Sequence, residues 1–295
     1  GYLAGQVVGN ATDLYTGFIK YLVDDQTIDQ FYEGKDVFVE ESDIKLFPNQ
    51  YVMMVSNANE KKTALSRFKC YSKALYRIFD GQGWDWVITP RNKEQSFAMD
   101  LLLDEHVPIV TLIGKAGSGK TLAAISAGLQ QVLEGRTYKR LIVSRPVQPM
   151  GRDIGYLPGT MEEKMRPWLA PIRDNMQFLM GNDKIMMEEY MTNGTVEIEA
   201  LTYIRGRSIS NAYIIVDEAQ NLSRHELKTI ITRVGEDTKI VLTGDIEQID
   251  NVYIDETSNG LTYAVEKFKH AEIAGHITLQ KGERSKVATL AARIL

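Results

Sequence analysis

Apolar and polar positions follow two different patterns along the chain, and the change falls near residue 90. Beyond it, short continuous apolar runs such as Ile214-Ile215-Val216 alternate with stretches in which apolar residues recur every three or four positions. The runs are typical of central parallel strands, and the stretches of amphipathic helices. Predicted strands span 107–113, 139–144, 195–201, 212–217, 238–243 and 275–280. Predicted helices span about 93–104, 120–134, 160–180, 183–192, 223–234, 259–269 and 284–295. This alternation predicts an α/β fold with a mostly parallel sheet.

The first 90 residues have a different pattern, with short apolar segments separated by turn-prone residues. Residues 36–40, 50–55 and 84–88 are predicted as strands. Thr89-Pro90-Arg91-Asn92 marks the end of this part. We therefore expect a small β-rich accessory domain over residues 1–90 and a second domain over residues 91–295.

A phosphate-binding loop motif follows the strand predicted at 107–113. Residues 114–121, Gly-Lys-Ala-Gly-Ser-Gly-Lys-Thr, match the pattern G-x-x-x-x-G-K-[ST] and precede a predicted helix. Glycines let backbone N–H groups surround a phosphate, the lysine can reach the outer phosphates, and the threonine hydroxyl can bind Mg²⁺. The alternative is a plain glycine-rich turn. The predicted nucleotide-binding residues here are Gly114, Lys115, Ala116, Gly117, Ser118, Gly119, Lys120, Thr121 and Leu122.

Two neighbouring carboxylates end the apolar strand at 212–217. Asp217 is the candidate Mg²⁺-associated residue, together with Thr121, and Glu218 is the candidate general base that polarises an attacking water. An acidic pair that caps the next helix is the alternative. Another apolar strand ends in Thr243-Gly244-Asp245, and Gln248 is the candidate that contacts both the attacking water and the outermost phosphate. A polar turn with a helix-capping Asp is the alternative for that segment.

Arginines at strand and loop ends are candidates for stabilising the charge that develops during phosphoryl transfer. They are Arg145, Arg205, Arg207 and Arg284. Arg284 is the first choice for a phosphate bound by the same chain, and Arg207 for a neighbouring subunit's site or a nucleic-acid backbone. Gln95 is a candidate reader of the adenine edge, which would favour ATP over GTP, although an exposed helix start explains it as well.

Composition narrows the classes of function. The net charge is -5 and the pI about 5.6, which argues against a broad basic surface wrapped around a long duplex, while a narrow channel for a single strand stays compatible. The chain has no apolar run long enough for a membrane span. A single cysteine, Cys70, suits a reducing compartment, and we expect a cytoplasmic protein. The four histidines lack metal-ligand spacing. The first residue is not Met, which suggests a fragment or a processed product.

The motifs, taken in order, resemble those of the PhoH-like ATPase family, which is related to superfamily-one helicases. The resemblance covers roughly residues 90–295 and rests on segments 91–95, 114–121, 144–147, 155–159, 205–208, 217–221, 243–248 and 282–285. It implies a RecA-like P-loop NTPase domain that hydrolyses ATP with Mg²⁺, acts on single-stranded RNA as a helicase or remodeller, and forms a homo-oligomeric ring, expected to be hexameric.

Residues 250–251 and 258–261 also resemble the branch of this family that carries an N-terminal PIN ribonuclease domain. The first 90 residues are too few for such a domain, which needs roughly 120–150 residues. We therefore expect the PIN domain in a longer parent chain, and no ribonuclease activity from this one. Two alternatives to a motor stay open: a non-catalytic scaffold gated by nucleotide, and a small-molecule kinase.

Overall fold

A six-stranded sheet lies at the centre of the protein. The computed structural model describes residues 14–79, 84–147, 161–201, 208–248 and 259–279, together with residues 287, 290, 291, 294 and 295. The strand order is β10-β5-β9-β8-β6-β7, and every neighbouring pair is parallel. The strands are β5 (Ile109–Ile113), β6 (Arg140–Arg145), β7 (Val196–Ala200), β8 (Ala212–Val216), β9 (Lys239–Gly244) and β10 (Ala274–Thr278). All six predicted strands are thus confirmed, as is the α/β class.

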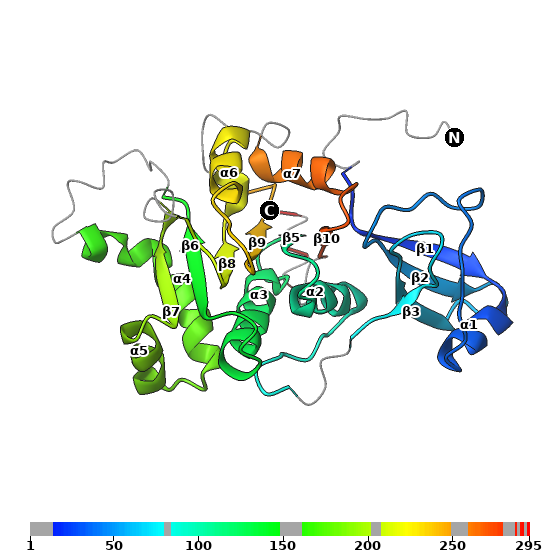
Figure 1. The fold of residues 1–295 in the computed structure, drawn as a ribbon, viewed down its shortest axis with the longest axis horizontal. Coiled ribbons are helices and arrows are strands. Elements are labelled where there is room, and N and C mark those ends of the chain that lie inside the picture. Colours follow the sequence, from blue (N-terminus) through cyan, green and yellow to red (C-terminus); the bar gives the residue numbers. More distant parts are fainter. Residues whose placement is uncertain are drawn as a thin grey trace.

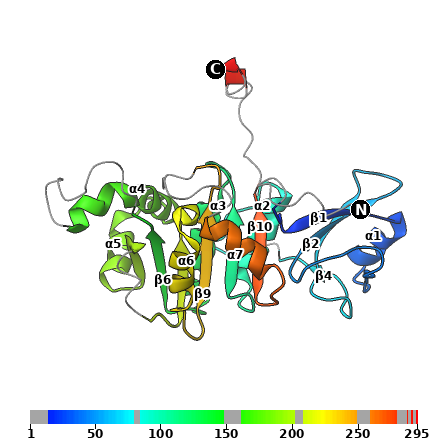
Figure 2. The same cartoon turned by 90° about the horizontal axis from the view of Figure 1, so that it is seen from above.

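Helices cover both faces of this sheet, as Figures 1 and 2 show. One face carries α2 (Lys93–Leu103), α3 (Lys120–Leu129) and α4 (Met161–Leu179), with α5 (Lys184–Thr192) beside them near β7. The other face carries α6 (Arg224–Ile231) and α7 (Gly260–Phe268). These six helices confirm the predicted ones; the seventh, at 284–295, falls largely outside the described residues. No described helix combines the length and apolar character that crossing a bilayer requires.

Two apolar cores result, because successive side chains of a strand point to opposite faces. Ile215 and Val241 belong to the core beneath α2, α3 and α4, whereas Ile214 and Ile240 belong to the core beneath α6 and α7. Both cores are closed to solvent, so the middle positions of the central strands carry apolar residues on both faces. This explains the continuous apolar runs of the sequence.

The N-terminal part has its own four-stranded sheet, and it differs from the sequence prediction. Its strands, in the order β1-β2-β3-β4, are β1 (Phe18–Val23), β2 (Tyr51–Ser56), β3 (Thr63–Arg67) and β4 (Tyr76–Arg77), and α1 (Asp25–Tyr32) connects the parallel pair β1 and β2. The strand predicted at 50–55 is confirmed as β2. The strands predicted at 36–40 and 84–88 are wrong, since both segments are irregular. Val37 and Val39 instead pack under the sheet with Ile28 and Phe31.

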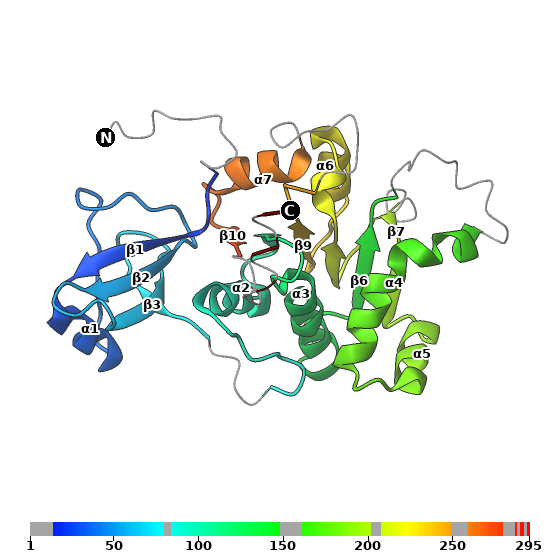
Figure 3. The same cartoon turned by 180° about the vertical axis from the view of Figure 1, so that it is seen from behind.

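The N-terminal sheet lies on the side of the molecule where α2 is found (Figure 3), and buried polar contacts join the two. Arg67 is 4% exposed and donates to Asp100 at 3.2 Å, and the Tyr51 hydroxyl donates to the same carboxylate at 2.6 Å. The Tyr51 ring also stacks on Phe97 with 4.5 Å between centroids. At the C-terminal end of α2, the fully buried Lys239 Nζ donates to the Leu101 and Asp104 carbonyls. The first residue of β9 and the N-terminal sheet thus both hold the same helix in place.

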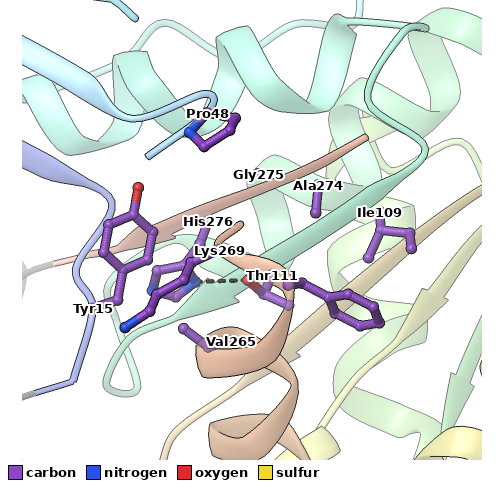
Figure 4. A pocket seen from close by; sticks show the side chains of 10 residues that line it. Tyr15, Pro48, Ile109, Thr111, Val265, Lys269, Ala274, Gly275 and His276 are labelled. Atoms are coloured by element: carbon purple, nitrogen blue, oxygen red, sulfur yellow. Dashed lines mark hydrogen bonds between the residues drawn. The ribbon is translucent and has the colours of Figure 1, made fainter. Parts of the chain in front are cut away.

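A cavity of about 10 Å³ lies between β5, β10 and α7 (Figure 4), large enough for roughly one water molecule. His276 lines it and contacts the Thr111 hydroxyl at 2.7 Å and the Thr278 hydroxyl at 2.9 Å. Burial lowers the pKa of His276 to about 3, so the ring is neutral. His276 is therefore a buried residue of the fold rather than a surface residue.

Candidate nucleotide and metal site

The phosphate-loop motif forms the connection between β5 and α3, at the carboxyl end of the central sheet. Gly119 precedes the helix with a φ of 83°, in the left-handed region that side chains rarely adopt. Gly114 N donates to Gly244 O at 3.0 Å, and a Cβ on Gly114 would lie 2.4 Å from Ser118 Oγ. The loop therefore closes tightly only with glycine at these positions, and it leaves the first N–H groups of α3 open to an anion.

Two side chains of the loop are prepared for a charged ligand. Ser118 is 1% exposed, and its Oγ has no hydrogen-bond partner within the described ranges. A buried hydroxyl without a partner is rare, and a phosphate oxygen would satisfy it. Lys120, the first residue of α3, is 8% exposed. These residues fit a nucleotide phosphate better than they fit a connecting turn.

The remaining predicted residues of the loop lie around this core. Ala116 and Gly117 are exposed, and Leu122 is half-buried on α3. Lys115 Nζ forms an ion pair with Glu247 at 2.7 Å, which joins the loop to the turn after β9. Gln95 lies in the first turn of α2; it accepts from Arg91 N at 2.7 Å and donates to Ser118 O at 3.3 Å. Its amide thus contacts the loop, and its reading of adenine stays a prediction.

Asp217 is the centre of a hydrogen-bonded row across three strands. Val216 pairs with Ser144 on β6 and with Leu242 on β9, so the next row contains Arg145, Asp217 and Thr243. The Asp217 side chain accepts at Oδ1 from Thr243 at 2.7 Å, and at Oδ2 from Arg145 at 2.7 and 3.2 Å. The carboxylate is 1% exposed.

Thr121 connects this row to the phosphate loop. Its hydroxyl donates to Asp217 Oδ1 at 3.0 Å, so the two residues predicted to hold Mg²⁺ are in contact. No group of three or more His, Cys, Asp or Glu residues that could hold a metal occurs in the described part of the chain. A hydroxyl and one carboxylate match the way Mg²⁺ binds when phosphate and water supply its other ligands. The donor set therefore fits a nucleotide-dependent Mg²⁺ rather than a permanent metal.

Glu218 is placed beside Asp217 in a strained backbone conformation. Its φ is 58°, the left-handed region, in which a non-glycine residue is held at a cost. Gln220 Nε2 donates to Glu218 Oε2 at 2.6 Å and to Gln248 O at 3.1 Å, while Asp245 N donates to Gln220 Oε1 at 3.2 Å. Burial and the Asp217 charge raise the pKa of Glu218, against opposing effects of Gln220, Arg145 and Lys120.

The other predicted catalytic residues are less well placed or lie elsewhere. Gln248 is exposed, and its backbone rather than its side chain contacts Gln220. Arg205, Arg207 and Arg284 fall outside the described residues. Arg145 is the candidate arginine that the structure brings to the site. The sequence analysis assigned no role to Thr243 or Gln220, although both stand in the motifs that it identified.

The family comparison agrees with this geometry. Residues 87–294 match the family model described as PhoH-like protein. The chain belongs to this family. It is 46% identical over 299 residues to "Protein PhoH2" of Bacillus subtilis (strain 168), covering 100% of this chain and 67% of that protein. It is 43% identical over 206 residues to "Protein PhoH2" of Mycolicibacterium smegmatis, covering 70% of this chain and 46% of that protein.

Solved structures resemble the chain only distantly. The Pif1 helicase from Candida albicans matches with a TM-score of 0.36 and 16% identity, over 70% of this chain and 43% of that one. A likeness at this level carries no argument about activity. The strand order, the loop and the family membership together identify a P-loop NTPase fold with a nucleotide-binding site, as the sequence analysis predicted.

Proposed function

We propose that the chain hydrolyses ATP with Mg²⁺ at this site and couples hydrolysis to the binding or remodelling of single-stranded RNA. The observation that carries the proposal is the Thr121–Asp217 contact of 3.0 Å with Glu218 beside it. The candidate phosphate-binding loop, the candidate Mg²⁺-binding pair and a carboxylate with a raised pKa thus lie close together at one end of the sheet. Hydrolysis needs these three elements, and mere binding needs only the first.

Each residue has a distinct role in the proposed reaction. The backbone N–H groups of residues 114–121, Ser118 and Lys120 bind the phosphates. Thr121 and Asp217 hold Mg²⁺, which neutralises charge on the phosphate oxygens when it is bound. Glu218 accepts a proton from the attacking water at a carboxylate oxygen, and its raised pKa makes it a better base than an ordinary glutamate. Gln220 holds Glu218 in position.

Two variants test the assignment with purified protein and Mg²⁺. Lys120→Ala and Glu218→Gln are each expected to reduce the hydrolysis rate by roughly 10²–10⁴-fold, in the range seen for loss of general-base or charge-stabilising groups. Lys139→Ala and Glu105→Gln are matched controls, because both residues are exposed and lie at the amino end of the sheet. Unchanged hydrolysis in Lys120→Ala and Glu218→Gln would contradict the proposal. ATP that stays bound and intact on the wild type would favour a nucleotide-gated scaffold, and transfer of phosphate to a metabolite would favour a kinase.

The RNA and the ring are supported by the family resemblance. We propose that single-stranded RNA stimulates hydrolysis and that the chain assembles into a homo-oligomeric ring, with six subunits as the expected number. Hydrolysis rates with and without single-stranded RNA or DNA test the first point, and sedimentation with and without ATP tests the second. Equal rates and a monomer under every condition would reject both. An N-terminal PIN ribonuclease domain in a longer parent chain and a cytoplasmic location stay predictions.

A further inference from the structure

Arg145 has contacts that the proposed reaction does not use. It ends β6 with its side chain 19% exposed, and two of its nitrogens contact the same oxygen, Asp217 Oδ2. Its third nitrogen donates to the Trp168 carbonyl on α4 at 3.1 Å, and Glu218 Oε1 lies 3.8 Å away. Hydrogen bonds to Asp217 and to the Trp168 carbonyl thus fix the position of the guanidinium.

Asp217 needs a nearby cation, because a carboxylate that is 1% exposed is costly to keep charged without one. The hydroxyls of Thr121 and Thr243 contact Oδ1 but carry no charge. Arg145 supplies the compensating charge at Oδ2. A divalent cation next to Thr121 would draw on the same carboxylate, so it would meet the repulsion of Arg145 at close range.

A triphosphate changes this balance, since it brings several negative charges to the same place. We propose that Arg145 keeps free divalent cations out of the site, so that Mg²⁺ enters only together with a nucleotide. Arg145 is a positioning residue in this scheme, because it acts through Asp217 rather than on the substrate. The inference rests on the proposed nucleotide site but not on hydrolysis.

Binding of Mn²⁺ as a probe, followed by electron paramagnetic resonance on nucleotide-free protein, tests the proposal. Wild type should bind Mn²⁺ weakly, and Arg145→Gln about tenfold more tightly, because one opposing charge is removed from a site with a low effective dielectric constant. Arg145→Lys keeps the charge and should stay close to wild type. Arg140→Gln is the matched control, since Arg140 lies at the other end of β6 and pairs with Glu197 at 3.0 Å. Adding Asp217→Asn to Arg145→Gln should abolish the gain.

Two results would overturn the inference. One is an Arg145→Gln variant that binds Mn²⁺ no more tightly than wild type. The other is a wild type that binds Mn²⁺ as tightly without nucleotide as with a non-hydrolysable triphosphate, and this measurement holds even if the variant does not fold. Thermal unfolding adds a second readout, in which Mg²⁺ alone should stabilise Arg145→Gln more than wild type. ATP hydrolysis by wild type is assayed separately, so a failure of the proposed function is distinguishable from a failure of this inference.

Discussion

Gln220 offers a direct test of how the candidate base is positioned. The variant Gln220→Met keeps the length of the side chain and removes the amide that donates to Glu218 Oε2 at 2.6 Å. A hydrogen bond to a charged group contributes roughly 1.5–3 kcal/mol, and the lower value applies here because the Glu218 side chain is 29% exposed and water can partly replace the donor. About 1.4 kcal/mol corresponds to a tenfold change in rate, so kcat should fall by about tenfold.

The pH dependence separates this effect from simple loss of structure. Gln220 is among the groups that lower the pKa of Glu218, so its removal should raise that pKa further. The base then becomes protonated at a higher pH, and the acidic limb of the kcat profile should move toward neutral pH. The measurement is kcat and KM for ATP across the pH range, with Gln30→Met, an exposed position on α1, as the control.

Two outcomes would refute this reasoning. An unchanged kcat and an unchanged profile would mean that Gln220 does not position the base. A loss that is equal at every pH and appears mainly in KM would mean that Gln220 supports nucleotide binding instead. Urea unfolding of the same variant measures its structural cost, expected at roughly 1–3 kcal/mol because the Asp245 N–H loses its acceptor.

Three further predictions concern the scaffold. Gly128→Ala should destabilise the protein by roughly 1–3 kcal/mol in urea unfolding, since the new Cβ would lie 2.8 Å from ring carbons of Tyr213; a more stable variant would contradict this packing. Arg67→Met should cost roughly 3 kcal/mol in the same assay, because Asp100 is left buried without its cation, and a neutral result would show that water reaches it. His276 makes the free energy of unfolding depend on pH, because its pKa is about 3 in the folded protein and about 6.5 in the unfolded chain. Between these two values only the unfolded chain gains the proton, so the free energy of unfolding falls by about 1.4 kcal/mol for each pH unit below about 6.5. His276→Gln should lack this slope between neutral pH and pH of about 4, and an equal slope in both proteins would rule out the buried neutral ring.

The sequence predicted the central sheet well because both of its faces are covered. Such strands carry continuous apolar runs, as at Ile214–Val216 in β8 and Ile240–Leu242 in β9, and their limits can be found from the flanking polar residues. The N-terminal sheet was harder. β1 contains Lys20 and has no fully buried position, so it lacks a clear alternation of apolar and polar residues. Val37 and Val39 show the alternation of a strand but lie in an irregular segment. Alternation reports which side chains are buried, not whether the backbone pairs.

The sequence predicted most residues of the candidate site but not the hydrogen bonds between them. The loop, Asp217 and Glu218 were identified because strand ends and glycine spacing are visible in the sequence. The position of β8 between β9 and β6 is not visible, and it is this order that places Thr243 and Arg145 on either side of Asp217. Likewise, the hydrogen bond from Gln220 to Glu218 depends on the conformation of the backbone after β8, which the sequence alone does not reveal.

The contacts that the N-terminal sheet makes with α2 have a practical consequence for work on shortened versions of this protein. A version that starts at residue 91 would retain every residue of the phosphate loop but would lose Arg67 and Tyr51, which cover Asp100 and Phe97. The uncovered helix would present an aromatic ring and an unneutralised acid to water, and it is the same helix whose first turn carries Gln95 and its contact with Ser118. Such a truncated protein is expected to aggregate, and weak nucleotide binding measured with it would reflect the truncation rather than a property of the intact protein.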